Sequence, residues 1–280
     1  MNKNALILWH SFLKAASSLD QGALANALQP DLLEEIQASA AVPLEAVLAK
    51  EELDPIHYSW FSPFLRTLPE REIKLFLASL APAQVRGLKQ SLLLSNALPS
   101  LSPQGKTYLK HILLTWIAKE EPSPIYCLPP DPINHLLDLT GEELLSLIDL
   151  LSMHDLSVEI RQIIDTTKLK SIYSLLTKAQ TSFLKTLLHK KEPISFKKIG
   201  LQNWKGDLEL LSAMLTQRGI NRIAKALYPD QGSLAWHVAH RLEIGKGQLL
   251  LKLCTPLDHP KACSVLKEQV VELINAFKPL

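Results

Sequence analysis

Nine lysines and four aromatic residues gather in one stretch of the chain, Lys168–Lys205. The lysines are residues 168, 170, 178, 185, 190, 191, 197, 198 and 205, and the only acid among them is Glu192. The aromatic residues are Tyr173, Phe183, Phe196 and Trp204. Lysines beside exposed rings can bind a nucleic-acid backbone while the rings stack on bases. They can equally bind an acidic protein surface, with the rings as apolar anchors.

Three interpretations of this stretch stay open: a solvated face, a protein-binding surface and a nucleic-acid interface. The stretch has no arginine, which is the usual side chain for bidentate reading of bases. Tyr173 and Phe183 also have the helical spacing of core residues. Protein binding is the functional interpretation that we favour, and nucleic acid is the alternative. The residues expected to carry it are Lys190, Lys191, Phe196, Lys197, Lys198 and Trp204.

Metal-ligand side chains gather near the carboxyl-terminal end of the sequence: His237, His240, Cys254, His259 and Cys263. Their spacing is not that of a known zinc site, because no Cys-x-x-Cys pair is present among them. Buried cysteines and a hydrogen-bonded Trp236/His237 pair are the expected alternative. We therefore expect no metal.

No other motif indicates catalysis. Glu243–Gly247 (EIGKG) lacks the Gly-x4-Gly-Lys-Ser/Thr frame of a phosphate-binding loop and follows an expected helix rather than a strand. No serine lies in a Gly-x-Ser-x-Gly sequence. The sequence therefore predicts no cofactor and no enzymatic activity.

The elements that must position these residues include an internal repeat. Ile73–Leu92 recurs without a gap as Leu169–Leu188, and seven of the twenty positions are identical. Thr177 and Gln180 form a capping box, the signature of a helix start, and Pro82 and Gln84 mark the same start in the first copy. Shared leucine-rich composition is the alternative explanation. The repeat predicts two copies of a helix pair with Leu88 and Leu184 in the core.

Helix signals also fill the rest of the chain, and no strand is expected. A capping box at Thr140–Glu143 predicts a helix over 144–151, and Asp155 is expected to cap the next helix, to residue 164. After an irregular stretch, 194–204, helices are expected at 206–217, 220–228, 233–243, 247–254 and 261–277. Gly219, Gly232 and Gly245 are the expected stops between them.

A proline-rich segment divides the sequence. Five prolines lie within 122–132, where they disfavour regular helix. We expect an amino-terminal helical domain over 1–120, a linker over 121–133 and a carboxyl-terminal helical domain over 134–280. Asp20–Asp54 contains eight acids and one base, which indicates either a solvated face or an acidic docking surface.

Composition supports a helical protein in a reducing compartment. Hydrophobic residues make up 47% of the 280 residues, but aromatics only 6%, which suits leucine-rich helices better than strands. Three cysteines are too few for a disulfide framework, so we expect a cytoplasmic location. The net charge of +2 selects no polyanion, and no apolar run is long enough to span a membrane.

Two short motifs carry resemblances to known families. Leu80-Ala-Pro-Ala-Gln84, followed by Leu88, resembles the armadillo-like units of the FliG family of flagellar rotor proteins. Ile56-His57 followed by Tyr58-Ser59-Trp60 is similar to an Ile/Leu-His-Pro segment of the SctK family, cytosolic adaptors of the type III secretion sorting platform, although Tyr58 replaces the proline. The leucine-rich, cysteine-poor composition and the expected carboxyl-terminal helices resemble those of small proteins of chlamydia-like intracellular bacteria. These resemblances imply a cytosolic, non-catalytic adaptor that binds other secretion components and needs no cofactor.

Together these observations predict an all-α protein of two helical halves, built from short antiparallel helix pairs of the armadillo-like kind. The expected function is protein–protein scaffolding, with nucleic-acid binding as the alternative.

Overall fold

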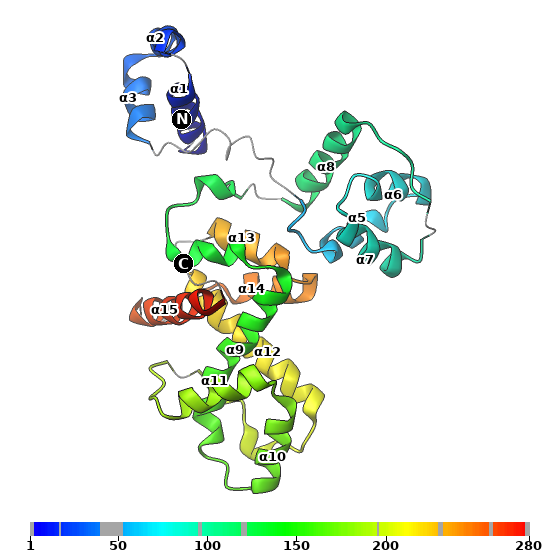
Figure 1. Ribbon diagram of the computed structural model, residues 1–280, viewed down its shortest axis with the longest axis vertical. Coiled ribbons are helices and arrows are strands. Elements are labelled where there is room, and N and C mark those ends of the chain that lie inside the picture. Colours follow the sequence, from blue (N-terminus) through cyan, green and yellow to red (C-terminus); the bar gives the residue numbers. More distant parts are fainter. Residues whose placement is uncertain are drawn as a thin grey trace. The chain divides into compact units, whose positions relative to one another are not determined.

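The computed structural model describes residues 3–16, 18–39, 53–94, 97–118, 122–194, 196–228, 232–257 and 260–277. All regular elements in these ranges are helices, and none is a strand (Figure 1). The all-α class predicted from the sequence is confirmed. Within the same ranges, no helix combines the length and the apolar character that a membrane span requires. Residues 40–52 of the acidic segment and His259 lie outside these ranges.

The chain divides into two compact units. The first contains Met1–Pro55 and Phe61–Pro130, and the second contains Ile56–Trp60 and Asp131–Leu280. The five residues Ile56–Trp60 thus belong to the second unit, although the chain on both sides of them belongs to the first. The domain boundaries expected around 121–133 stay a prediction.

The first unit contains two groups of helices. In the first group, α1 (Lys3–Ala15), α2 (Ser18–Ala27) and α3 (Pro30–Ala38) pack through a small core of Leu6, Leu13 and Ile36. The second group consists of α5 (Ser62–Leu65), α6 (Glu70–Leu77), α7 (Pro82–Leu92) and α8 (Pro103–Ile117). Here α6 packs on α8 and α5 packs on α7. A short 3-10 helix, η2 (Ile125–Cys127), follows.

The second unit is built around two long helices, α9 (Gly141–Ile160) and α12 (Leu208–Leu227), which pack on each other. The helices α11 (Lys178–Leu188) and α15 (Pro260–Phe277) pack on α9 (Figure 1). The helices α10 (Thr166–Leu175), α13 (Gly232–Arg241), α14 (Ile244–Leu253) and α15 contact α12. Three 3-10 helices complete the unit: η1 (Tyr58–Trp60), η3 (Pro132–Asp138) and η4 (Leu201–Asn203).

Each sequence repeat folds into two consecutive helices, and the bounds of the second helix match between the copies. The offset of 96 residues relates both ends of α7 to both ends of α11, and it relates the first residues of α6 and α10. Leu88 in α7 and Leu184 in α11 are both fully buried. Both copies thus contain two consecutive helices, and the predicted core leucines are confirmed.

The starts of α7 and α11 explain why the chain turns at the same place in each copy. In the second copy, Thr177 Oγ1 accepts from Gln180 N (3.2 Å), and Gln180 Oε1 accepts from Thr177 N (2.7 Å). In the first copy, Ala81 has no acceptor side chain, so only the return bond forms, from Ala81 N to Gln84 Oε1 (3.2 Å). The side-chain nitrogen Nε2 of Gln84 donates to Leu53 O (2.6 Å), which ties this helix to the chain before it.

Two helix boundaries predicted from the sequence are wrong. The helix does not end before Asp155, because α9 continues from Gly141 to Ile160 and buries Asp155 on its inner face. No helix ends at Gly219 either, because α12 continues from Leu208 to Leu227. A Cβ atom at Gly219 would lie 1.9 Å from Ile148 O of α9. Glycine is therefore needed for the close approach of the two long helices rather than for a helix end.

Residues Ile56–Trp60 are held in the second unit by hydrogen bonds and ring stacking. His57 N donates to His240 O (2.8 Å), Ile244 N donates to Ser59 Oγ (2.8 Å), and Trp60 Nε1 donates to Leu242 O (2.9 Å). The ring of His240 is stacked between Trp60 and Trp236, with 3.9 Å between ring centroids on each side.

Candidate protein-binding surface

The four lysines expected to bind a partner lie on the segment that joins α11 to α12, residues 189–207, called here the lysine loop. Lys190, Lys191, Lys197 and Lys198 are all exposed on it. None of the four is ion-paired to a carboxylate within the residues that the structure describes. The loop has almost no regular structure, yet buried charged side chains fix its backbone.

Arg222 of α12 is the main anchor of the loop. Its side chain is 0% exposed. It donates to Asp155 Oδ1 (2.8 Å), Glu192 Oε1 (3.2 Å) and Gln269 Oε1 (2.8 Å), and to the carbonyl oxygen of Ile194 (3.1 Å). The guanidinium also lies 5.4 Å from the ring centre of Phe196. One buried cation therefore joins α9, α15 and three residues of the lysine loop.

Glu192, the only acid of the lysine-rich stretch, points inward to this cluster. His154 Nδ1 donates to its Oε2 atom (2.6 Å), and Gln269 Nε2 donates to its Oε1 atom (3.0 Å). Burial alone would raise the pKa of Glu192, but the hydrogen bond from His154 and the charge of Arg222 lower it to about 2. Because this carboxylate is buried, it does not neutralise the lysines on the surface.

Glu159 fixes the second half of the loop. Its carboxylate accepts three successive backbone amides: Ile199 N, Gly200 N (2.8 Å) and Leu201 N (3.1 Å). Gly200 has a φ of +89°, a conformation that side-chain-bearing residues rarely adopt. Successive amides in such a turn form a concave site for an anion, and here a side chain of the same chain fills it.

Two arginines hold backbone carbonyls at the edges of the loop. Arg161 donates through Nη2 to the carbonyls of Leu187 (2.8 Å), Leu188 (3.0 Å) and Lys190 (2.6 Å), so it satisfies the carboxyl end of α11. Arg218 donates to the carbonyl of Lys198 (3.3 Å). The lysines are thus presented on a backbone whose position is determined at several points.

The two aromatic residues proposed as anchors lie in different places. Phe196 is half-buried over Arg222. Trp204 is only 8% exposed and belongs to a core cluster with Leu201, Leu211 and Leu215, and its Nε1 donates to Asp207 O (2.8 Å). The structure therefore places the four lysines on the surface, Phe196 at its edge and Trp204 in the core beneath it.

The histidines and cysteines weighed as metal ligands are separated in the fold. His240 lies in the stack of Trp60 and Trp236, and its Nδ1 bonds to Trp236 O (2.8 Å) rather than to a cysteine. The rings of Trp236 and His237 meet edge to face, with centroids 5.1 Å apart. Three or more possible metal-ligand side chains do not converge anywhere in the described ranges. The cysteines among these residues are free, and burial raises the pKa of the Cys254 thiol.

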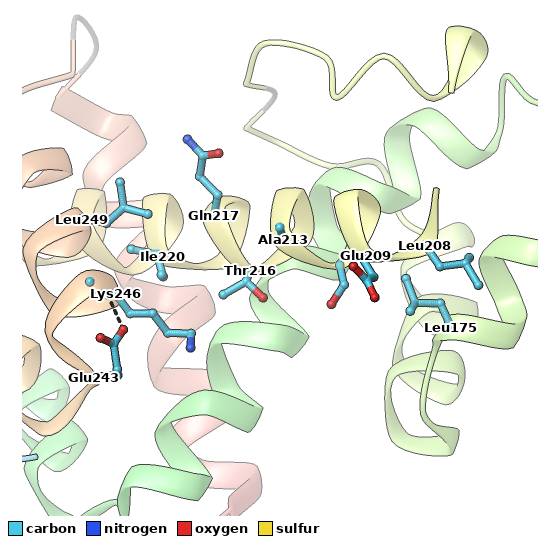
Figure 2. Close-up of a pocket in the computed structure, with 12 residues that line it drawn as sticks. Leu175, Leu208, Glu209, Ala213, Thr216, Gln217, Ile220, Glu243, Lys246 and Leu249 are labelled. Atoms are coloured by element: carbon cyan, nitrogen blue, oxygen red, sulfur yellow. Dashed lines mark hydrogen bonds between the residues drawn. The ribbon is translucent and has the colours of Figure 1, made fainter. Parts of the chain in front are cut away.

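A separate pocket of about 720 Å³ follows the side of α12. Figure 2 shows Leu208, Ala213, Thr216 and Ile220 along the helix, with Leu175 at one end and Leu249 and Lys246 at the other. The helix end at this pocket is not a phosphate site. Glu243 accepts from Lys246 N with its own carboxylate (3.3 Å), and Ser59 accepts from Ile244 N. Two of the first amides of α14 are therefore already satisfied by acceptors of this chain.

The sequence interpretation missed the buried charges that position the loop. Arg222, Glu159 and His154 were not singled out, and Asp155 was taken for a helix cap, although one signal could have found Arg222. Leu211, Leu215, Gly219 and Arg222 recur at intervals of three or four residues, so they share the buried face of α12. An arginine on such a face requires buried acceptors.

Comparison with protein-family models, with curated proteins and with solved structures finds no match for this chain.

Proposed function

We propose that this chain is a non-catalytic adaptor that binds an acidic surface of a partner protein through Lys190, Lys191, Lys197 and Lys198. The observation that carries the proposal is the contrast between the two sides of the lysine loop. These four lysines of the loop are exposed and lack carboxylate partners among the described residues, while Glu192 is paired below the surface. From residue 189 to residue 205 the loop therefore presents only positive charge at its surface.

The fixed backbone of the loop supports specific recognition of a protein. Binding is weakened by the entropy lost when a mobile surface becomes ordered. Here Arg161, Glu159 and Arg222 already hold the backbone, so ordering costs less when a partner binds. Exposed like charges also accelerate encounter with an acidic surface.

The resemblances in the sequence narrow the proposal to a partner in a type III secretion apparatus. They rest on Ile56–Trp60 and on the Leu80–Gln84 start of a helix pair. On this proposal the chain is a cytosolic component of the sorting platform, and it acts through contacts rather than chemistry.

The experiment uses a variant in which Lys190, Lys191, Lys197 and Lys198 are all changed to glutamate. The matched control changes four exposed lysines elsewhere, Lys14, Lys106, Lys252 and Lys261, to glutamate. Both variants have the same net charge, so a difference between them reports position. The wild type and both variants are used as bait in native lysate, and the retained proteins are identified by mass spectrometry. We expect acidic proteins to be retained by the wild type and the control and to be lost from the loop variant.

Binding of an RNA or DNA oligomer by each protein is measured at low and at physiological salt. A contact made only by phosphate neutralisation weakens steeply with salt. Sub-micromolar oligomer binding at physiological salt, lost only in the loop variant, would make nucleic-acid binding the better function. Retention of the same proteins by the loop variant would show that these lysines are not the binding surface.

A further inference from the structure

One large apolar side chain of the second unit is almost fully exposed beside the lysine loop. Ile164 is 94% exposed and lies in the short connection between α9 and α10, Arg161–Asp165. A single exposed isoleucine is ordinary on a protein surface, so its exposure alone does not indicate a binding site. The position of Ile164 relative to the exposed lysines determines whether it can take part in binding.

The connection that contains Ile164 contacts both halves of the lysine loop. Arg161 donates to the carbonyl oxygen of Lys190 (2.6 Å) in the first half. Gln162, the next residue, accepts through Oε1 from Nζ of Lys198 (3.0 Å) in the second half. Ile164 is only two residues further along, and two residues of extended chain span at most about 7 Å. A partner segment of a few residues that contacts Lys198 can therefore also contact Ile164.

The backbone around Ile164 is ordered on both sides, although its side chain is exposed. Before it, Ile160 lies in the core and Ile163 packs against the same cluster, so the apolar contacts of this turn are already made. After it, Asp165 Oδ1 accepts from Thr167 N (2.8 Å) and begins α10. The exposed side chain is thus presented on a fixed turn, which lowers the entropy lost when a partner binds.

The charges near Ile164 indicate which kind of segment fits there. Arg161, Lys190 and Lys198 are exposed, and no carboxylate of the described residues pairs with any of them. The acid next to Ile164 in sequence, Asp165, accepts from the first amides of α10. An acidic segment is therefore attracted to this surface, and apolar side chains among its acids would cover Ile164.

We infer that Ile164 is the apolar contact of the lysine loop surface, and that the partner supplies an acidic segment with apolar side chains in its middle. The inference rests on the proposed function and adds the kind of segment that a partner must carry. Ile164 takes the role expected of Trp204, which lies in the core. Salt screens exposed charge pairs but not an apolar contact, so Ile164 supplies the salt-resistant part of binding.

Two labelled peptides, EEDLLDEE and EEDSSDEE, test the inference on the full chain. They carry the same charge and differ only in their two central residues. Binding is measured by fluorescence anisotropy at low and at physiological salt. We expect the wild type to bind the leucine peptide about tenfold more tightly, which is roughly the ratio that burial of one large apolar side chain supplies. This ratio should persist at physiological salt, although both affinities fall.

Ile164→Ser should bind both peptides about equally, and it should fold because the residue is exposed. Leu93→Ser, at a residue of the first unit that is 92% exposed, is the matched control and should keep the tenfold preference. The inference is overturned if Ile164→Ser keeps that preference, or if the wild type does not distinguish the two peptides. A different result would refute the proposed function and the inference with it: binding of either peptide that is unchanged when the four lysines of the loop become glutamate.

Discussion

Arg222 shows how much a single buried charge can organise in this chain. Its side chain has no exposure to solvent, and its partners come from α9, α15 and the lysine loop. A buried ion pair contributes little net stability compared with apolar packing, but removal of one partner leaves a charge unpaired. The cluster therefore selects one arrangement of these three segments and disfavours the others.

His240 provides a prediction of pH dependence at the residue scale. Burial between Trp60 and Trp236 lowers its pKa from 6.5 to about 4, although its hydrogen bond to Trp236 O opposes the shift and His237 adds to it. The unfolded chain binds this proton near pH 6.5 and the folded chain only near pH 4, so stability falls as the pH is lowered through this window. The expected loss is on the order of 3 kcal/mol.

Denaturant titrations at several pH values between about 7 and 4 would measure this loss. This range covers the ordinary pKa of a histidine and the lowered pKa of His240. His240→Phe keeps a ring between the two tryptophans but cannot titrate, so its stability should depend less on pH. Some slope should persist, because burial also lowers the pKa of His57. Glu192 adds a further loss of stability at lower pH, because its pKa is lowered from 4.5 to about 2 in the folded chain. An unchanged slope in His240→Phe would contradict the assignment.

At the scale of elements, local signals in the sequence predicted helix starts well and long helices poorly. Thr177 and Gln180 act on neighbouring backbone atoms, so their effect could be predicted without the rest of the fold. Asp155 and Gly219 are residue types that often stand at helix termini, but here each contacts a residue that is distant in sequence. Asp155 pairs with Arg222, and Gly219 admits Ile148 O. Such residues can be interpreted only when the partner is known.

The candidate surface was likewise predictable only in part from the sequence. The composition of the lysine-rich stretch showed that charge of one sign gathers there. It could not show that Glu192 turns inward or that Trp204 enters the core, because both depend on partners in other helices. A pocket between α9, α11 and α15 was also beyond prediction, since its walls come from three helices separated in sequence.

The repeated helix pairs lead to a prediction at this scale. Leu88 and Leu184 occupy equivalent positions and are both fully buried. Replacement of either by alanine should reduce the free energy of unfolding by about 2–5 kcal/mol, from lost burial and the cavity left behind. Ile164→Ala, at a residue that is 94% exposed, is the control and should change little. A loss below about 0.5 kcal/mol at both leucines, in the same denaturant titration, would be too small for core positions.

At the scale of the whole molecule, the second unit depends on five residues from the first half of the sequence. Ile56–Trp60 belongs to this unit, whereas the chain before and after it belongs to the first unit. Gly247 shows how closely the segment packs, because a Cβ atom there would lie 2.6 Å from Cζ2 of Trp60. The order of elements in the sequence is thus not the order of folded units.

Trp60→Ala tests this dependence. The change removes the stack on His240 and the hydrogen bond to Leu242 O, and a buried tryptophan replaced by alanine costs about 3–5 kcal/mol. Since these contacts lie on α13 and at the start of α14, we expect amide hydrogen exchange to accelerate there, while α6 and α7 keep their protection. Trp116→Ala in α8 is the matched control, and its effect should stay within the first unit. Equal loss of protection in both units on Trp60→Ala would mean that they unfold as one cooperative body, and that the segment does not belong to the second unit alone.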